Sequence, residues 1–404
     1  RIVSCEQILR YMYVTGPNND KLPFMTGFMD IDNLVPAFLI LVAFCAVVGG
    51  IPLARLAAMR VGLTDKPGGR KTHDDEIPLV GGLVIFPIYM VVGHFAGMDF
   101  ASYWPLYLSL CLVLVTGALD DMYHVGAWVR FFVQIVAATV IVIVGDARLY
   151  HLGDLFGFGN LGLGFMSIPF SIIAVTLFVN AINLMDGLDG LAAGKSAIVL
   201  GWLMLSCAIV GAWAPFFHMA ILMACLIGFL FYNMRHPFRS KASIFLGDAG
   251  SLGLGLVLAW YCIGLAHEPD PIVVPIMIAW IIALPVIDAC GQFYRRVKEG
   301  KHPFEPDRGH FHHHFIHAGI PVGHSTVLIL IWGFVLGGIG YFGIFFGVPQ
   351  PVLTLGWIIL LFSHMAISYK PRVFIAFLSR FGAKPEDLGI EEAAAPKSQA
   401  DNNR

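Results

Sequence analysis

Long runs of apolar residues, separated by short polar segments, are the feature that most constrains the fold of this chain. A helix that crosses a bilayer needs roughly 17 to 25 predominantly apolar residues. About eleven runs of this length follow one another: 33–58, 79–97, 102–119, 127–145, 166–183, 192–211, 214–233, 249–266, 272–291, 325–346 and 351–369. Because backbone polar groups in lipid must be hydrogen-bonded within the protein, such runs are expected to be helical. The sequence therefore predicts an all-α integral membrane protein with about eleven transmembrane helices.

The composition supports a membrane protein. Of the 404 residues, 57% are hydrophobic and 13% are charged, and the mean hydropathy is +0.76. Soluble domains carry about 25% charged residues. The formal net charge of -2 gives no reason to expect a nucleic-acid partner. The seven cysteines are scattered without paired spacing, so we interpret them as packing residues rather than metal ligands or disulfides.

We expect three parts in the chain. Residues 1–32 lack the basic-then-apolar layout of a signal peptide and begin without Met, so we interpret them as an added extracytoplasmic segment without an assigned function. Residues 33–369 form the polytopic domain. Residues 370–404 are expected to be a cytoplasmic tail that is partly disordered, because its end, EEAAAPKSQADNNR, is poor in large apolar residues.

The distribution of Lys and Arg predicts the orientation, since cytoplasmic loops of membrane proteins are rich in both. With the N-terminus in the periplasm and the C-terminus in the cytoplasm, all 25 basic residues except Arg1, Arg10, Lys21 and Arg148 lie on the cytoplasmic side. Every polar-rich connection whose residues could take part in catalysis or ligand binding then lies on that side as well. The outer connections are mostly short, apart from residues 145–164, whose glycines and aromatic residues favour a small hairpin. The chemistry of this chain is therefore expected at its cytoplasmic face.

Two adjacent carboxylates, Asp120 and Asp121, directly follow the third apolar run. Neighbouring positions of a helix point in directions about 100° apart and do not face each other. We therefore expect the two side chains to have different roles, one facing the bundle and one at its rim. A pair of carboxylates at the end of a span is also a common polar stop, and the sequence leaves that alternative open.

Polar residues also gather in the segment NAINLMDGLDGLAAG, between two apolar runs. Asn180, Asn183 and Asp186 recur every third residue and so share one face of the last helical turns, and two glycines then let Asp189 enter a loop. A central charge in lipid costs roughly 2.5–3.5 kcal/mol, so these groups must face water, one another or an ion. Such oxygen ligands suit Mg²⁺, which binds one or two carboxylates together with substrate phosphates. A hydrogen-bonded helix end is the alternative.

Three further polar residues lie at the inner ends of other runs. Asn233 ends the seventh run. Asp248, in the segment FLGDAGS, is either the N-cap of the eighth helix or a ligand of a metal at a helix N-terminus. Asp288 lies within the ninth run near its inner end, where pairing with Arg295 or Arg296 is one explanation.

The segment KHPFEPDRGHFHHHFIH places Arg308 next to four histidines: His310, His312, His313 and His314. A zinc site is one interpretation, but neither Cys nor an HExxH pattern accompanies the histidines. Arg and His in such numbers more readily bind anionic oxygens, Arg as a bidentate donor and His as a donor or proton shuttle. The segment therefore indicates an anion site.

A second basic group, Arg70, Lys71 and His73, either adds positive charge to that site or forms a loop at the membrane surface. Together the cytoplasmic segments offer acidic groups for Mg²⁺ and cations for phosphates, at a face open to water and to lipid. P-loop, GxSxG and HExxH patterns are absent from the sequence. This combination favours phosphoryl transfer from a soluble, doubly phosphorylated donor to a lipid acceptor. A transporter or flippase is the alternative, and it would place its charges near the membrane midplane in two related halves.

These motifs resemble those of the polyprenyl-phosphate N-acetylhexosamine-1-phosphate transferases. The Asp pair after the third run, NAxNxxDGxDGL, FLGDAGS and PDRxHxHH occur in the order and spacing of that family, from about Asp65 to Ala318. IPLVGG, RKTH and PDRGHFHH are similar to the branch that transfers GlcNAc 1-phosphate from UDP-GlcNAc to undecaprenyl phosphate and releases UMP. That branch begins O-antigen, common-antigen or teichoic-type polysaccharides at the bacterial inner membrane. His314, a third consecutive histidine, is similar to the branch that transfers phospho-MurNAc-pentapeptide, which stays the alternative.

The resemblance implies a role for each matched residue. Asp248 and Asn183 would bind Mg²⁺, or Mn²⁺ in its place, against the diphosphate, and Asp186 would support the metal region. Asp120 or Asp121 would orient or deprotonate the lipid phosphate, and Asp189 would bind the uracil. The catalytic set that the resemblance implies is Asp120, Asp121, Asp186 and His310. The predicted substrate-binding set also contains Asn233, Arg70, Lys71, His73, Arg308, His312 and His313.

The expected partners are UDP-GlcNAc, undecaprenyl phosphate and membrane lipid, and the expected cofactor is Mg²⁺. The sequence does not decide between direct attack and a phospho-aspartate intermediate. It also leaves open the oligomeric state, a homodimer included.

Overall fold

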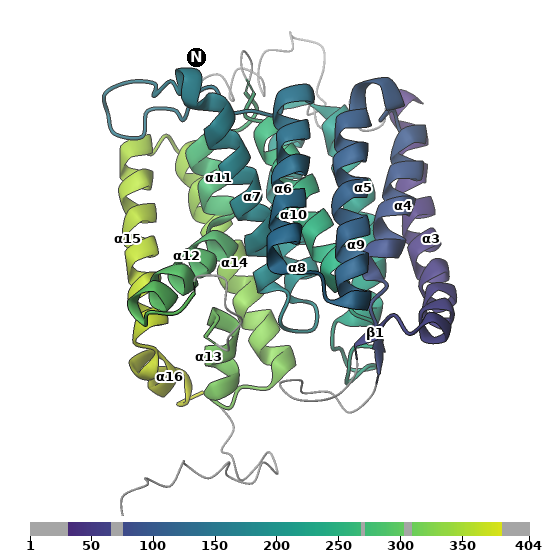
Figure 1. The fold of residues 1–404 in the computed structure, drawn as a ribbon. Helices are drawn as coiled ribbons and strands as arrows, with labels where there is room; N and C mark the ends of the chain where they lie inside the picture. Colours follow the sequence, from purple (N-terminus) through teal and green to yellow (C-terminus); the bar gives the residue numbers. More distant parts are fainter. Residues whose placement is uncertain (1–30, 66–75, 268–270, 303–308, 382–404) are drawn as a thin grey trace, which may run out of the picture.

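The computed structural model describes residues 31–65, 76–267, 271–302 and 309–381, and within them the chain is mostly helical (Figure 1). Arg70, Lys71, His73 and Arg308 lie outside the described residues. The longer helices are α3 (Ile31–Val61), α4 (Gly81–Phe95), α5 (Phe100–Tyr123), α6 (Ala127–Thr139), α7 (Ser167–Met185), α8 (Leu191–Val210), α9 (Trp213–Asn233), α10 (Gly247–Gly264), α12 (Ala283–Lys298), α14 (Val322–Phe345) and α15 (Gln350–Tyr369). The shorter elements are α11 (Pro275–Ile281), α13 (Phe311–His317), α16 (Arg372–Leu378), the π-helical turn Val140–Val144, the 3-10 turn Gly164–Met166 and the paired strands β1 (Thr64–Asp65) and β2 (Ile77–Pro78).

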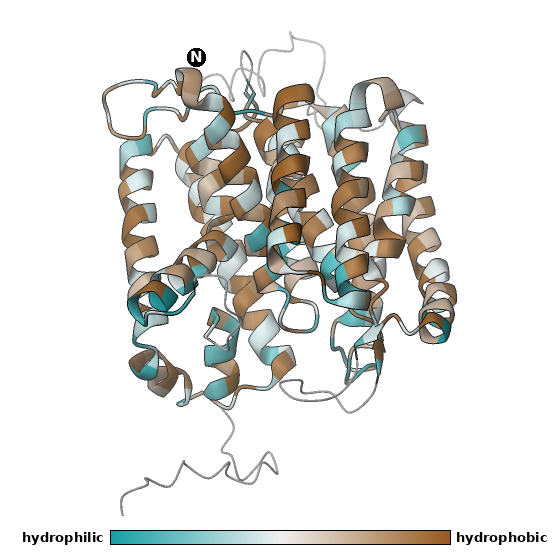
Figure 2. Cartoon of the chain, viewed as in Figure 1, coloured by the Kyte–Doolittle hydropathy of each residue, from teal (hydrophilic) through white to brown (hydrophobic). Residues whose placement is uncertain are grey.

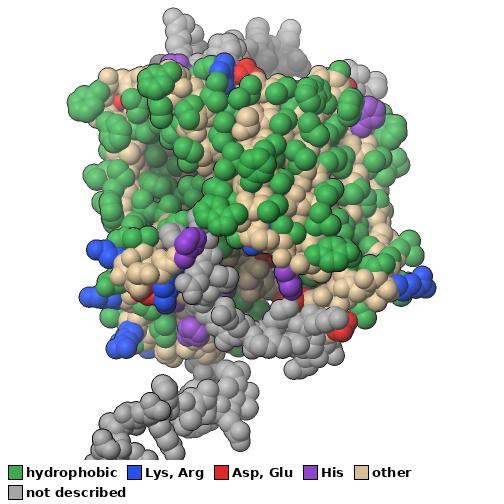
Figure 3. Space-filling view, viewed as in Figure 1, with side chains coloured by type: hydrophobic (Ala, Val, Ile, Leu, Met, Phe, Trp, Pro, Cys, Tyr) green, Lys and Arg blue, Asp and Glu red, His purple; other side chains and the backbone are tan. Residues whose placement is uncertain are grey.

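The helices form a bundle whose outer surface is apolar. Among the described residues, eight helices are long and apolar enough to cross a membrane, or nine if α11 and α12 form one bent span. Large apolar side chains such as Leu53, Phe132 and Phe362 are exposed. Figure 3 shows hydrophobic side chains covering most of the bundle surface that faces the viewer. Such a surface is typical of a protein that faces lipid. The prediction of an all-α integral membrane protein is therefore confirmed.

All of the predicted apolar runs fall on helices, but the count of about eleven spans stays a prediction. Helix α4 has only 15 residues. Helix α10 is also absent from the eight, because its glycines and Asp248 dilute its apolar residues. Both helices lie largely inside the bundle, where protein rather than lipid surrounds them.

Helix α10 is the centre of the packing, and its small residues allow the neighbouring helices to approach closely. A Cβ atom at Gly82 of α4 would collide with the backbone of Gly250, and one at Gly117 of α5 would collide with the backbone of Ala249. A Cβ atom at Gly255 would lie 2.6 Å from the Cα atom of Val179 in α7. This close packing brings the first turn of α10 against the ends of α5 and α7.

Helices α11 and α12 are two halves of a broken helix that bends by 75°. Lys195 of α8 is fully buried beside the break, and its Nζ donates to the carbonyl of Ile281 at 2.9 Å and to that of Gly333 at 3.2 Å. Carbonyls in the last turn of a helix lack intrahelical partners. The two hydrogen bonds from Lys195 Nζ therefore stabilise the break after which α12 crosses toward α15 (Figure 1).

Polar segments gather at one end of the bundle, the lower end in Figures 1 and 2, which we call the polar end; it contains β1, α13 and α16. Helix α16 lies within the range expected to be a tail and packs on α13, with Phe374 stacked on Phe311 at 5.6 Å between ring centroids. The predicted hairpin lies at the opposite end. Hydrogen bonds from Leu152 N to Leu161 O and from Leu161 N to Gly153 O, both 2.9 Å, confirm it.

Candidate active site

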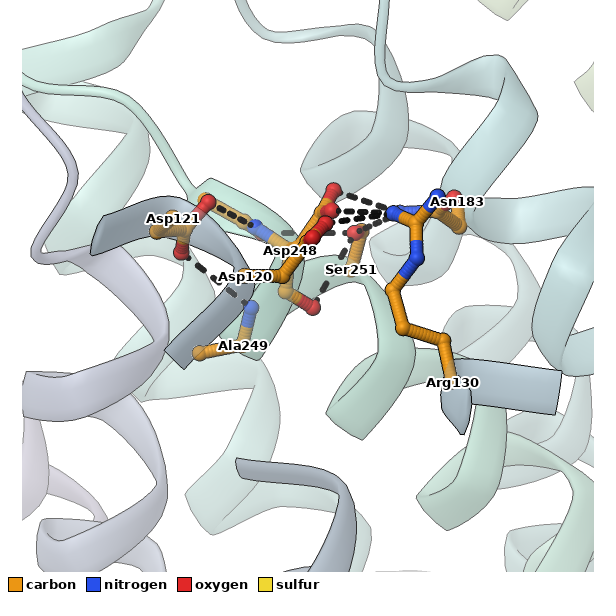
Figure 4. A network of polar contacts seen from close by, with 8 residues as sticks. Asp120, Asp121, Arg130, Asn183, Asp248, Ala249 and Ser251 are labelled. Carbon is orange, nitrogen blue, oxygen red and sulfur yellow. Dashed lines mark hydrogen bonds and ion pairs between the residues drawn. The ribbon is translucent and has the colours of Figure 1, made fainter. Parts of the chain in front are cut away.

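Four helices bring charged and amide side chains together at the polar end (Figure 4). Arg130, in the first turn of α6, lies between two carboxylates. Its Nη1 donates to Oδ2 of Asp120 in α5 at 2.5 Å and to Oδ2 of Asp248 in α10 at 2.8 Å. The other carboxylate oxygen of Asp248 accepts a hydrogen bond from Nδ2 of Asn183 in α7 at 2.8 Å. These four residues, separated widely in the sequence, form one acidic cluster around a guanidinium group.

Asn183 is held in this cluster by a second contact. Its Nδ2 also donates to Oγ of Ser251 at 2.9 Å, and Oγ of Ser251 donates to the carbonyl of Gly247 at 3.2 Å. In this orientation Asn183 presents its amide nitrogen to Asp248. An amide oxygen would have to turn toward Asp248 before Asn183 could share a metal ion with it.

Asp121 binds different partners from Asp120. Its Oδ1 accepts a hydrogen bond from the backbone nitrogen of Asp248 at 3.0 Å, and its Oδ2 accepts one from that of Ala249 at 3.5 Å. The first amides of a helix have no intrahelical partner, so Asp121 caps α10 from a neighbouring helix. Gly247 has a φ of +75°, and a Cβ there would lie 2.6 Å from Oδ2 of Asp121.

The hydrogen bonds of Asp120, Asp121 and Asp248 test two predictions from the sequence. The two adjacent carboxylates point to different partners, as the sequence predicts. The alternative of Asp248 as the N-cap is wrong, because α10 begins at Gly247 and the Asp248 side chain is directed to Asn183 and Arg130 instead. The free energy of capping comes from Asp121.

Asn180 does not take part in the acidic cluster. Its Nδ2 donates to Oε1 of Gln134 in α6 at 2.5 Å and to the carbonyl of Thr176 at 2.8 Å. It therefore ties α7 to α6 one helical turn away from Asn183.

The acidic cluster fits the chemistry of a divalent cation. Among the described residues, no three His, Cys, Asp or Glu side chains could hold a metal ion by themselves. Mg²⁺, however, usually binds one or two carboxylates and fills its shell with waters and substrate phosphates. Asp120 and Asp248 provide two such carboxylates, and both already face one positive charge, that of Arg130. A divalent ion bound beside the guanidinium would supply further positive charge to these two carboxylates.

The loop from Asp186 to Gly190 is fixed from three sides. Nε of Arg235 donates to Oδ2 of Asp189 at 2.7 Å, and Oγ1 of Thr326 donates to the backbone carbonyl of Asp189 at 3.1 Å. Oδ1 of Asn233 accepts from the backbone nitrogen of Gly190 at 2.8 Å, and its Nδ2 donates to the carbonyl of Ile244 at 2.9 Å. Asn233 is buried, and both ends of its amide are engaged within the protein.

Asp186 follows the last turn of α7 and is accessible to solvent, although protein surrounds it on most sides. Its pKa is raised to about 8, first because the surrounding protein excludes water and then because Asp248, Asp121 and Asp189 add negative charge. A carboxyl group in this environment favours a nearby cation.

A second polar cluster lies where α12 meets α13. Oδ2 of Asp288 accepts from Nδ1 of His310 at 3.1 Å. Oδ1 of Asp288 accepts from the backbone nitrogen of Phe311 at 3.0 Å, from Nε2 of Gln292 at 3.3 Å and from Nε2 of His364 in α15 at 3.4 Å. Asp288 is therefore held by these groups and not by Arg295 or Arg296, which corrects that expectation.

Helix α13 carries its histidines to the loop at the end of α7. The imidazole of His312 packs on Gly187, where any Cβ would collide with it. Within the described residues, Nε2 of His312 and Nδ1 of His314 are buried without a hydrogen-bond partner. Burial, followed by neighbouring positive groups, lowers the pKa of His312 to about 3; burial likewise lowers the pKa of His314 to about 4. Both rings are therefore neutral at physiological pH.

Arg130, Arg235 and His364 are among the residues of these clusters that were not predicted as site residues. A signal for Arg130 exists, since it is the one Lys or Arg between Lys71 and Arg148 in the sequence. His364 is a lone histidine within an apolar run. For Arg235 the sequence offers no signal beyond a basic loop.

Residues 103–266, which contain Asp120, Asn183 and Asp248, match the family model described as glycosyl transferase family 4. The chain is similar to the undecaprenyl-phosphate alpha-N-acetylglucosaminyl 1-phosphate transferase of Yersinia pestis, with 33% identity over 77% of this chain and 83% of that protein. It is also similar to the proteins of the same name from Salmonella typhi and Escherichia coli (strain K12), each with 32% identity over 71% of this chain and 78% of the relative.

Proposed function

The chain belongs to glycosyl transferase family 4, and from this premise we propose that it transfers GlcNAc 1-phosphate from UDP-GlcNAc to undecaprenyl phosphate. The observation that carries the proposal is the convergence of Asp120, Asn183 and Asp248 from three helices at one end of an apolar bundle. A lipid can reach such a place from the side and a nucleotide can reach it from water. The names of the relatives describe the same transfer.

The reaction exchanges one phosphoanhydride for another. An oxygen of the lipid phosphate attacks the β-phosphorus of UDP-GlcNAc, the bond from that phosphorus to the bridging oxygen breaks, and UMP leaves with the bridging oxygen. The lipid product is undecaprenyl-diphospho-GlcNAc. Catalysis of phosphoryl transfer rests mainly on positioning and on neutralising charge. Because the second pKa of a phosphate monoester is about 6, the attacking oxygen needs little help from a base near neutral pH.

We assign the acidic cluster to the diphosphate and its metal ion. Asp248 is the main ligand that we propose for Mg²⁺, with Mn²⁺ as a substitute, and Asn183 is its neighbour. When bound, Mg²⁺ supplies positive charge at the diphosphate oxygens. Arg130 can bind a phosphate group with its planar guanidinium, and Asp120 keeps that guanidinium in place. Asp121 acts on the site through α10, whose first turn it caps.

We assign donor binding to the loop after α7 and to α13. Asp189 is the residue that we propose for uracil, and Arg235 holds its carboxylate in position. Asn233 fixes the loop through Gly190 instead of contacting substrate. Asp186 is proposed to support the metal region, where a bound cation would favour its ionised form. The groups proposed to grip the diphosphate and the sugar are His310, His312 and His313, together with Arg308, Arg70, Lys71 and His73 outside the described residues.

The membrane arrangement completes the proposal. We infer about eleven spans, with the N-terminus in the periplasm and the C-terminus in the cytoplasm, because nearly all Lys and Arg residues then lie on the cytoplasmic side. The polar end would face the cytoplasm, where UDP-sugars are found. The enzyme would lie in the bacterial inner membrane and begin the assembly of a surface polysaccharide on undecaprenyl phosphate.

The proposal is tested by UMP release from the purified protein in detergent, with undecaprenyl phosphate and Mg²⁺. UDP-GlcNAc, UDP-GalNAc and UDP-MurNAc-pentapeptide are compared side by side. We expect release from UDP-GlcNAc that requires both the lipid and the metal. Release from UDP-MurNAc-pentapeptide alone would move the chain to the peptidoglycan reaction, and transport of a labelled substrate without UMP would replace the enzyme by a transporter.

A further inference from the structure

Asp288 is a buried carboxylate outside the acidic cluster. It contacts His310, one of the histidines proposed to bind the sugar nucleotide. Asp288 is only 2% exposed and His310 only 5% exposed. Oδ2 of Asp288 lies 3.1 Å from Nδ1 of His310, whereas Nε2 on the other side of the ring lies 3.5 Å from Nη2 of Arg296. The imidazole is therefore enclosed between a carboxylate and a guanidinium.

The hydrogen-bond chemistry of these two neighbours fixes the tautomer of the ring. An ionised carboxylate can only accept, so Nδ1 of His310 must carry a proton. A guanidinium can only donate, so Nε2 has to be the acceptor. His310 is thereby set as the Nδ1-protonated form, with a lone pair on Nε2 toward Arg296.

The carboxylate itself cannot rotate freely. Its Oδ1 is fixed by donors from three elements: the backbone nitrogen of Phe311 in α13, Gln292 in α12 and His364 in α15. Its Oδ2 is consequently left for His310. The last long helix thus supports the ring through His364, although no atom of α15 contacts His310 directly in the described hydrogen bonds.

We propose that Asp288 is a positioning residue, which sets the tautomer and direction of the His310 imidazole and is itself anchored to α15 by His364. This inference rests on the proposed function, because His310 is taken to act on the sugar nucleotide. A lone pair on Nε2 can accept a hydrogen bond from a hydroxyl of the sugar, whereas it cannot donate to a diphosphate oxygen. Carboxylates orient metal-binding histidines in this way, and their removal typically costs about 10–100-fold in metal affinity or activity.

Asp288→Asn is the informative substitution, since it keeps the shape and removes the charge. The three donors on Oδ1 demand the amide oxygen there, so the amide nitrogen must face Nδ1 of His310. Nδ1 then has to accept, and the proton moves to Nε2, where it faces Arg296. We expect kcat/KM for UMP release to fall by about 10–100-fold.

A double-mutant cycle separates positioning from general support of the fold. His310→Gln removes the ring, so adding Asp288→Asn to it should change kcat/KM by less than about 2-fold if Asp288 acts through His310. Multiplied losses in the double variant would overturn the proposal. Tyr89→Phe is the matched control, because it removes another buried hydrogen bond, the 2.7 Å contact with Tyr261, far from the histidines. Its activity should stay within about 2-fold of wild type.

A spectroscopic measurement keeps the inference testable even if the wild-type protein releases no UMP, a result that would count against the proposed function alone. Nitrogen NMR of histidine-labelled protein in lipid, with His310→Gln to assign the signal, reports which ring nitrogen is protonated. We expect a protonated Nδ1 in wild type and in Tyr89→Phe, and a protonated Nε2 in Asp288→Asn. An unprotonated Nδ1 in wild type, or no change in Asp288→Asn, would overturn the proposal. If Asp288→Asn fails to fold, His364→Gln takes its place and should leave Nδ1 protonated but shift its resonance; an unshifted resonance would remove α15 from the network.

Discussion

Nη1 of Arg130 lies 2.8 Å from Oδ2 of Asp248, so the carboxylate proposed to bind a metal ion already faces a fixed positive charge. The same guanidinium nitrogen contacts Asp120. An ion and Arg130 would therefore share the negative charge of two carboxylates. The balance between them should set both the metal requirement and the neutralisation of the diphosphate.

Arg130→Met tests this balance. Without the guanidinium, the two carboxylates attract a divalent ion more strongly, so half-maximal activity should need several-fold less Mg²⁺. Turnover at saturating Mg²⁺ should nevertheless fall by at least about 10-fold, because a donor to the phosphate groups is lost. Titrating Mg²⁺ in the UMP assay measures both effects, and Arg130→Lys should be intermediate. An unchanged Mg²⁺ requirement would separate Arg130 from the metal site.

The adjacent carboxylates should differ in what they stabilise. Asp121→Ala removes the cap of α10 and should cost about 0.5–2 kcal/mol of unfolding free energy, visible as a lower Tm in detergent. Asp120→Asn should leave the Tm close to wild type while lowering kcat strongly, because Asp120 faces Arg130 and not a helix end. Equal losses of Tm in the two variants would contradict the division of roles.

Arg235→Met should weaken donor binding selectively. Arg235 holds the carboxylate of Asp189, which we propose to bind uracil, and it lies away from the acidic cluster. The ion pair is partly exposed, so only about a 2–5-fold rise in KM for UDP-GlcNAc is expected, with kcat nearly constant. Steady-state kinetics separates the two parameters. A fall in kcat at unchanged KM would place Arg235 in the chemical step instead.

The histidines of α13 predict a loss of stability in acid. Burial lowers the pKa of His312 to about 3 and that of His314 to about 4, below the ordinary value of about 6.5 in an unfolded chain. Between pH 6.5 and these values the unfolded state binds more protons, so the stabilisation is complete above about pH 6.5 and is lost as the pH falls.

The measurement is the Tm in detergent at pH 7.5 and at pH 5.0. We expect a lower Tm at pH 5.0 and a smaller difference in His314→Phe, because one buried imidazole no longer has to be protonated on unfolding. The same pH dependence in wild type and His314→Phe would show that this histidine does not contribute.

Much of the fold follows from the length and polarity of the apolar runs alone. Each predicted run is helical, because a chain in lipid has few other ways to pair its backbone groups. The residues Asp120, Asn183 and Asp248 could also be predicted as site residues from the sequence. A polar group within a membrane helix costs free energy unless it binds a partner or a ligand.

The partners of these residues could not be predicted, because they depend on how the helices pack. Asp121 caps α10 only because Gly117 and Gly247 let α5 and α10 approach closely. His364 reaches Asp288 only because α12 bends away from α11 and meets α15. Contacts between segments so distant in the sequence leave no periodic pattern along the chain.

The central claim is that a phosphate group travels with the sugar. UDP-GlcNAc labelled with ³²P at the β-phosphate tests it most directly, with wild type and Asp248→Asn compared in the presence of undecaprenyl phosphate and Mg²⁺. Asp146→Asn, at the opposite end of the bundle, serves as the control variant. We predict that the label enters the lipid fraction in wild type and in the control and not in Asp248→Asn, while unlabelled UMP is released. Label that stays in water as UDP while GlcNAc enters the lipid would contradict the account.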